Sequence, residues 1–105
     1  MIAEEERLEE KYEGFMAGKC FLCGGRIYKI RAEWAKRKYC LYQRYPRAAW
    51  GYYCPSCKAV HLRYADAQVG YDEIIVLKKD KPVYKLRRLV GNGKEEFSEK
   101  WFMEG

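Results

Sequence analysis

Cys20-Phe21-Leu22-Cys23 and Cys54-Pro55-Ser56-Cys57 decide the fold of this chain, because both place two residues between a pair of cysteines. Two residues between thiolates allow a tight turn to direct both sulfurs at one ion, and two such turns complete a four-sulfur shell. Gly24 and Gly25 can supply the positive φ that such a turn needs, and Pro55 bends the second turn. The spacing predicts a metal site formed by Cys20, Cys23, Cys54 and Cys57.

The alternatives for these cysteines are two disulfides or four buried thiols. We favour metal binding, because reducing compartments disfavour disulfides and paired two-residue spacings seldom arise in a core. A closed shell of four thiolates leaves no position for water, so we expect a structural cofactor. We expect Zn²⁺, with iron as the less favoured metal. His61 is an alternative ligand, although we favour packing or hydrogen bonding near the site, and Cys40 is expected to pack as a small apolar residue.

Residues 19–62 resemble the zinc ribbon family, in which two such knuckles at the tips of β-hairpins hold one structural zinc. Tyr53-Cys54-Pro55-Ser56-Cys57, followed by Val60-His61-Leu62, looks like the second knuckle of many small ribbon proteins of bacteria and their phages. The resemblance implies a metal-dependent fold and leaves the function open.

A second resemblance is to rubredoxin, whose similar spacing holds an iron for electron transfer. It is carried by Cys23-Gly24, by Ile27-Tyr28 and by Trp50 before Cys54-Pro55. The segment between the pairs departs from rubredoxin, whose loop is acidic, because here it is basic and contains Glu33 as its single acid.

Length and composition limit the class of protein further. A chain of 105 residues has room for one domain, and with 34% charged residues it contains no apolar run near the about 18–20 residues of a membrane span. The acidic N-terminus lacks the basic and apolar regions of a signal peptide. We therefore expect a cytoplasmic protein in a reducing environment, without membrane contact.

The predicted fold class is α+β, as a single domain over residues 1–105. It consists of an acidic N-terminal helix over 1–18, a zinc-ribbon core over 19–62 and a C-terminal hairpin with a short terminal helix over 63–105. Within the core, residues 50–53 are expected to pair with residues 26–30, and a basic helix is expected over 30–45, ended by Pro46. Residues 72–77 and 83–86 predict the hairpin, and residues 95–103 the terminal helix.

Charge and aromatic residues concentrate in residues 24–53. This stretch has eight basic side chains against Glu33 alone, together with eight of the aromatic residues. Cations displace the counterions of a nucleic acid, and aromatic rings stack on unpaired bases, so the mixture favours single strands or RNA loops. The candidate phosphate contacts are Arg31, Lys36, Arg37, Lys38, Arg44 and Arg47, and the candidate stacking residues are Tyr39, Tyr42 and Tyr45.

No catalytic constellation is evident, so we expect a non-enzymatic protein that binds nucleic acid or a nucleic-acid machine. One alternative is a small interaction protein of phage or mobile-element type, which binds a host protein and inhibits or redirects it. Its contact surfaces would be the acidic N-terminal segment and the aromatic residues Phe97, Trp101 and Phe102. The basic segment would equally suit an acidic protein surface as partner. A further alternative is rubredoxin-like electron transfer. The sequence does not determine the oligomeric state.

Overall fold

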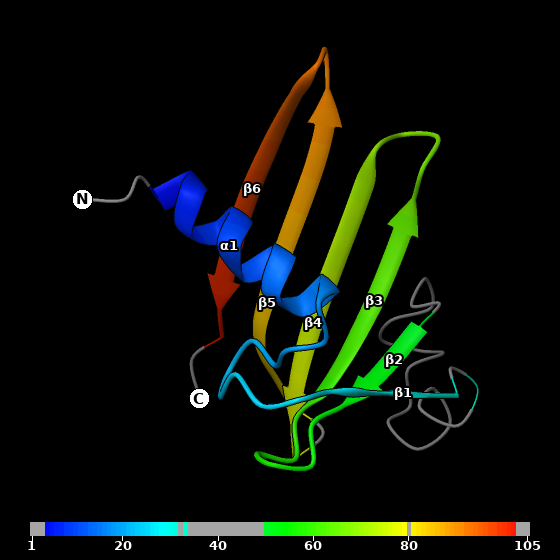
Figure 1. The fold of residues 1–105 in the computed structure, drawn as a ribbon. Helices are drawn as coiled ribbons and strands as arrows, with labels where there is room; N and C mark the ends of the chain where they lie inside the picture. The colour runs from blue at the N-terminus through cyan, green and yellow to red at the C-terminus, as the bar shows by residue number, and fades with distance from the viewer. Residues whose placement is uncertain (1–3, 32, 34–49, 80, 103–105) are drawn as a thin grey trace.

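The fold was analysed in a computed structural model that describes residues 4–31, 33, 50–79 and 81–102. Within these residues the elements are α1 (Glu4–Met16), β1 (Tyr28–Ile30), β2 (Trp50–Tyr53), β3 (Val60–Asp66), β4 (Tyr71–Lys78), β5 (Lys81–Gly91) and β6 (Lys94–Trp101). The six strands form one sheet in sequence order, and every neighbouring pair is antiparallel. The helix crosses one face of this sheet over its C-terminal strands (Figure 1).

The predicted α+β fold with several helices is wrong, because the described chain is a six-stranded meander with one short helix. Most of the predicted terminal helix is strand β6 instead. Phe97 and Trp101 are four residues apart, as on a helix, but they pair with Arg88 and Tyr84 of β5. The predicted basic helix over 30–45 falls outside the described residues apart from 30, 31 and 33, and Ile30 is the last residue of β1.

The predicted N-terminal helix is confirmed as α1. Leu8 and Phe15 are buried and Tyr12 is half-buried, so one helical stripe packs on the sheet. The helix ends in a Schellman motif: Gly18 adopts φ +96°, and the N–H of Lys19 donates to the Gly14 carbonyl over 2.9 Å. This turn leads the chain from α1 directly into the first cysteine pair. In the part of the chain that the structure describes, no helix has the length and apolar character to cross a membrane.

The predicted hairpin is confirmed as β4 and β5, although both strands are longer than expected. The next hairpin, β5 to β6, turns at Asn92 and Gly93, which adopt φ values of +53° and +75°. Two positive φ values in a two-residue loop characterise a type I′ turn, whose twist matches that of the flanking strands. The Asn-Gly pair therefore directs β6 back along β5.

The two faces of the sheet carry separate apolar clusters. On the face covered by α1, Ile74, Val76 and Leu86 lie beneath the helix and are fully buried. On the opposite face, the buried side chains are Val60, Leu62, Ile75 and Leu77. Strand alternation explains this arrangement, because successive residues of β4 project to opposite faces.

Two carboxylates fix α1 to the sheet: Asp72 is buried and Glu99 is half-buried. Asp72 accepts hydrogen bonds from Tyr12 over 2.6 Å and from Arg63 over 2.8 and 3.0 Å. Glu99 accepts from Tyr84 over 2.6 Å and from Arg7 over 2.7 Å.

The titration of these groups follows their contacts. Burial opposes ionisation of Glu99, but its hydrogen bonds from Tyr84 and Arg7 outweigh burial and lower the pKa of the carboxyl. The pKa of Tyr12 is raised by burial and by its hydrogen bond to Asp72. The helix is thus held by charge-assisted hydrogen bonds at two positions along its length.

Candidate metal centre

The first cysteine pair forms a knuckle between α1 and β1. A bridge between Lys19 and Arg26 closes its base. The N–H of Cys20 donates to the Gly25 carbonyl over 2.7 Å, and the N–H of Gly24 donates to the Cys20 carbonyl over 3.1 Å. Backbone N–H groups also point at the thiols: Leu22 at Cys20 Sγ and Gly25 at Cys23 Sγ, each over 3.3 Å. Such donors stabilise thiolates.

The second pair, between β2 and β3, repeats the same backbone pattern. The N–H of Cys54 donates to the Ala59 carbonyl over 2.9 Å, and the N–H of Lys58 donates to the Cys54 carbonyl over 2.7 Å. Lys58 adopts φ +62°, at the position where the first knuckle has Gly24 with φ +73°. The two knuckles therefore share one backbone conformation. The positive φ of Gly24 agrees with the expectation from the sequence.

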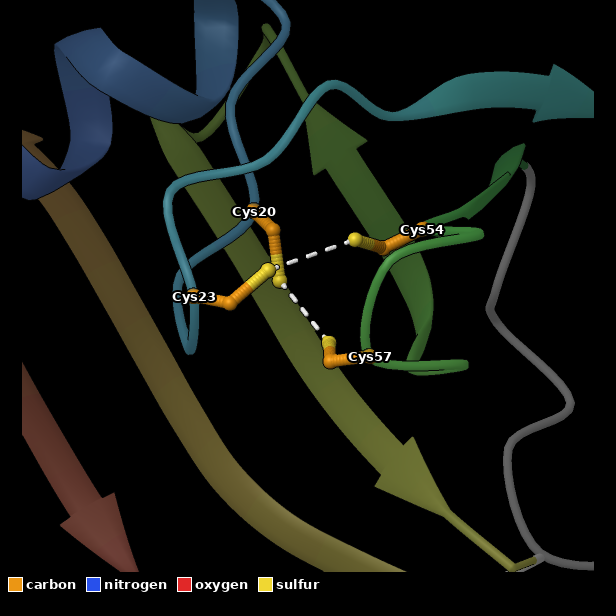
Figure 2. A group of neighbouring side chains, drawn as sticks. All are labelled: Cys20, Cys23, Cys54 and Cys57. Carbon is orange, nitrogen blue, oxygen red and sulfur yellow. Dashed lines mark hydrogen bonds between the residues drawn. The ribbon is translucent and has the colours of Figure 1, made fainter.

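The knuckles bring all four sulfurs together (Figure 2). Cys20 Sγ lies 3.6 Å from Cys57 Sγ, Cys23 Sγ lies 3.5 Å from Cys54 Sγ, and all four atoms lie within 4.8 Å of one another. A tetrahedral ion with metal–sulfur distances of about 2.3 Å separates its sulfurs by about 3.8 Å. All four thiols are free. The cluster can therefore hold a metal ion, as the spacing predicts.

The thiols differ in burial and in ionisation. Cys54 and Cys20 are buried, whereas Cys23 is exposed. Burial raises the pKa of the Cys20 thiol to about 12. At Cys54, the N–H of Cys57 and the thiol of Cys23 outweigh burial and lower the pKa to about 7. The Cys54 thiol thus ionises at lower pH than the Cys20 thiol, to the thiolate form that a metal binds.

The two knuckles pack closely against each other at Gly25. A Cβ at Gly25 would lie 2.9 Å from Ser56 Oγ and 3.2 Å from Cys23 Sγ. The same construction at Gly24 meets nothing within 4 Å. The first glycine after Cys23 therefore serves backbone conformation, and the second gives the other knuckle room to approach.

His61 is outside the sulfur cluster and packs beside it, as we favoured. Its side chain is fully buried, stacks 5.8 Å from the rings of Phe15 and Phe21, and accepts the backbone N–H of Phe21 at Nε2 over 3.3 Å. Nδ1 has no hydrogen-bond partner among the described residues. Burial lowers the pKa to about 4, although the nearby Tyr52 carbonyl favours protonation. The neutral imidazole thus supports a residue of the first knuckle.

The predicted pairing of residues 26–30 with residues 50–53 is confirmed for residues 28–30 and 51–53, with Tyr28 opposite Tyr53 and Lys29 opposite Tyr52, whereas Arg26 bridges Lys19. Arg31 is described and exposed. The remaining candidates for nucleic-acid contacts lie outside the described residues, as does Cys40: Lys36, Arg37, Lys38, Tyr39, Tyr42, Arg44, Tyr45 and Arg47.

Sequence reasoning missed the ion pair between Arg63 and Asp72. The pair lies beside β2, because the Arg63 guanidinium is 5.5 Å from the Trp50 ring centroid. Alternation of Val60, Leu62 and Tyr64 with His61 and Arg63 was the available signal, because it places both polar residues on one face of a strand.

Comparison of the chain with known proteins identifies no relative, so its function is inferred from its own residues. No family model, no curated protein and no solved structure matches it significantly.

Proposed function

We propose that this chain is a small zinc-ribbon protein in which a structural Zn²⁺ joins the two knuckles. The observation that carries the proposal is the convergence of four sulfurs within 4.8 Å of one another. Four thiolates form a closed tetrahedral shell, the donor set of structural zinc sites. The metal would connect α1 and β1 to the β2–β3 turn, so its binding energy would contribute to folding.

Zinc is preferred to iron because the segment between the cysteine pairs is basic, unlike the acidic loop of rubredoxin. Elemental analysis of the purified protein tests this choice. We expect one zinc per chain and a colourless solution. A red protein with one iron would instead support the electron-transfer alternative.

The structural role is tested with two cysteine variants. Cys54 is fully buried, and Cys54→Ser removes one ligand from the cluster. We expect loss of the metal and of cooperative thermal unfolding. The matched control is Cys40→Ser, at the cysteine outside both pairs, which is expected to keep both properties. A Cys54→Ser protein that melts like the unchanged protein would contradict a structural metal.

We further propose that the protein is a non-enzymatic binder of single-stranded nucleic acid. Its support is the charge of residues 24–53, with eight basic side chains against one acid. In the described part of this stretch, Arg26, Lys29 and Arg31 are all exposed, on or beside strand β1. Exposed cations of one sign attract phosphates and release their counterions.

Fluorescence anisotropy with labelled single-stranded RNA, single-stranded DNA and duplex DNA at two salt concentrations tests this binding. We expect preference for a single strand and an affinity that falls steeply with salt. Replacing Lys36, Arg37 and Lys38 together by Glu is expected to abolish binding while the metal content stays unchanged. Absence of binding at low salt would favour the alternative of an acidic protein partner.

A further inference from the structure

The sheet has an open region where α1 ends. On the face that α1 covers, strand pairing places Lys29 opposite Tyr52, and Trp50 opposite Arg63. A cleft of about 140 Å³ lies between this row and the end of the helix. We call it the Tyr52 cleft; its lining includes Phe15, Met16, Ile27, Lys29, Tyr52 and Arg63.

The size of the Tyr52 cleft restricts what it can hold. Sites for small-molecule ligands commonly measure about 300–1,000 Å³, so a cleft of about 140 Å³ is too small for a whole cofactor. Its lining includes the buried side chains of Phe15 and Ile27, with the ring of Phe15 edge-on to Tyr52 at 5.3 Å. A single planar group fits this combination of size and lining.

The lining of the Tyr52 cleft carries positive charge. It contains Lys29 and Arg63 and no acidic side chain. Lys29 is exposed and has no ion pair within the described residues, whereas Arg63 is already bound to Asp72. Arg31, two residues beyond Lys29, is also exposed. A ligand that reaches the cleft therefore meets the positive charges of Lys29 and Arg31 beside the ring of Tyr52.

We propose that the Tyr52 cleft receives one unstacked base of a single-stranded nucleic acid, with the adjacent phosphates on Lys29 and Arg31. The inference rests on the proposed nucleic-acid binding and specifies where a base enters. Aromatic stacking accepts any base, and cations along a backbone hold phosphates, so the pair of features suits a single strand with little sequence preference. An acidic protein partner would use the cations but would not require a base.

The test compares two labelled probes on the metal-loaded protein: a ten-nucleotide oligo-dT and an abasic oligomer with the same number of phosphates. We expect tighter binding of oligo-dT. Tyr52→Leu keeps an apolar side chain but removes the stacking ring. This variant is expected to weaken the affinity for oligo-dT by about 5- to 100-fold and to leave the affinity for the abasic probe unchanged. Lys29→Gln is expected to weaken both probes and to reduce the salt slope by about 0.7.

The control is Lys94→Gln, which makes the same charge change at the exposed start of β6. It is expected to leave both affinities and the salt slope unchanged. If the unchanged protein binds oligo-dT and the abasic probe equally, the base does not enter a site and the inference fails, although phosphate binding stands. If neither probe binds, both the inference and the proposed nucleic-acid function fail. If Tyr52→Leu retains its metal but loses affinity for both probes by the same factor, the inference is also overturned.

Discussion

Lys58 adopts in the second knuckle the left-handed backbone conformation that Gly24 adopts in the first, with φ +62° against +73°. A side chain in this conformation costs about 1–2 kcal/mol, whereas glycine adopts it freely. The second knuckle therefore carries backbone strain that the first avoids, although both make the same hydrogen bonds.

Lys58→Gly is expected to raise the free energy of unfolding by about 0.5–1 kcal/mol, because relief of the positive φ exceeds the entropy that glycine adds to the unfolded chain. Chemical denaturation of the metal-loaded protein measures it. Lys58→Ala is the control, since it removes the same charge and keeps the strain. If both variants change the stability equally, the backbone conformation is not the cause.

Gly25→Ala is expected to weaken metal affinity by about 10-fold, because the new methyl group would crowd Ser56 and the Cys23 sulfur and misplace a ligand. Competition with a chelator of known affinity measures the change. Adding Ser56→Gly removes the crowded side chain and is expected to restore the affinity. If the second change restores no affinity, the contact with the Cys23 sulfur and not the one with Ser56 is the cause, and an unchanged affinity in Gly25→Ala itself would show that the approach of the knuckles does not depend on Gly25.

Acid is expected to destabilise the protein through His61. The pKa is about 4 in the folded chain, against about 6.5 in the unfolded chain, so the unfolded state takes up the proton first as the pH falls. The contribution of the neutral His61 side chain to the free energy of unfolding is fully present above pH 6.5. It is lost progressively between about pH 6.5 and pH 4, with about 1 kcal/mol lost by pH 5.5.

Denaturation at pH 7.5 and at pH 5.5, with metal content checked at both, measures this loss. His61→Gln keeps an acceptor for the N–H of Phe21 and does not titrate, so its stability is expected to vary less over this interval. Because His61 is the single histidine of the chain, an equal pH dependence in the variant would assign the effect to the metal site instead.

Asp72→Asn is expected to lower the free energy of unfolding by about 3 kcal/mol, because it leaves the Arg63 guanidinium beside a neutral partner in a buried site. The Asp72 side chain is 4% exposed. The control is Glu95→Gln, which breaks the more exposed ion pair with Arg88 and is expected to cost less than about 1 kcal/mol. Similar losses in both variants would refute the importance of burial.

The sequence predicted the features that depend on local patterns. Cysteine spacing identified the four clustered sulfurs, and the stripe of Leu8, Tyr12 and Phe15 identified α1. The apolar run in residues 72–77 and the proline-ended turn after it identified the β4–β5 hairpin.

The sequence did not predict β6, because one of its inward-facing residues is charged. Phe97, Glu99 and Trp101 share the face toward α1, and Glu99 interrupts the apolar alternation that marks a strand. Its burial becomes intelligible once Arg7 and Lys11 of α1 are known to pair with it. A contact between residues so distant in the chain leaves no local pattern.

The ion pair between Arg7 and Glu99 links the first helix to the last strand, whereas the four-sulfur cluster is complete once Cys57 is present. Every strand pairs with its neighbour in sequence, so the sheet can grow in the order in which a ribosome releases the chain. The knuckles are consequently able to close before α1 has a surface to cover. Assembly of this fold during synthesis would begin at the knuckles and finish when α1 joins β6.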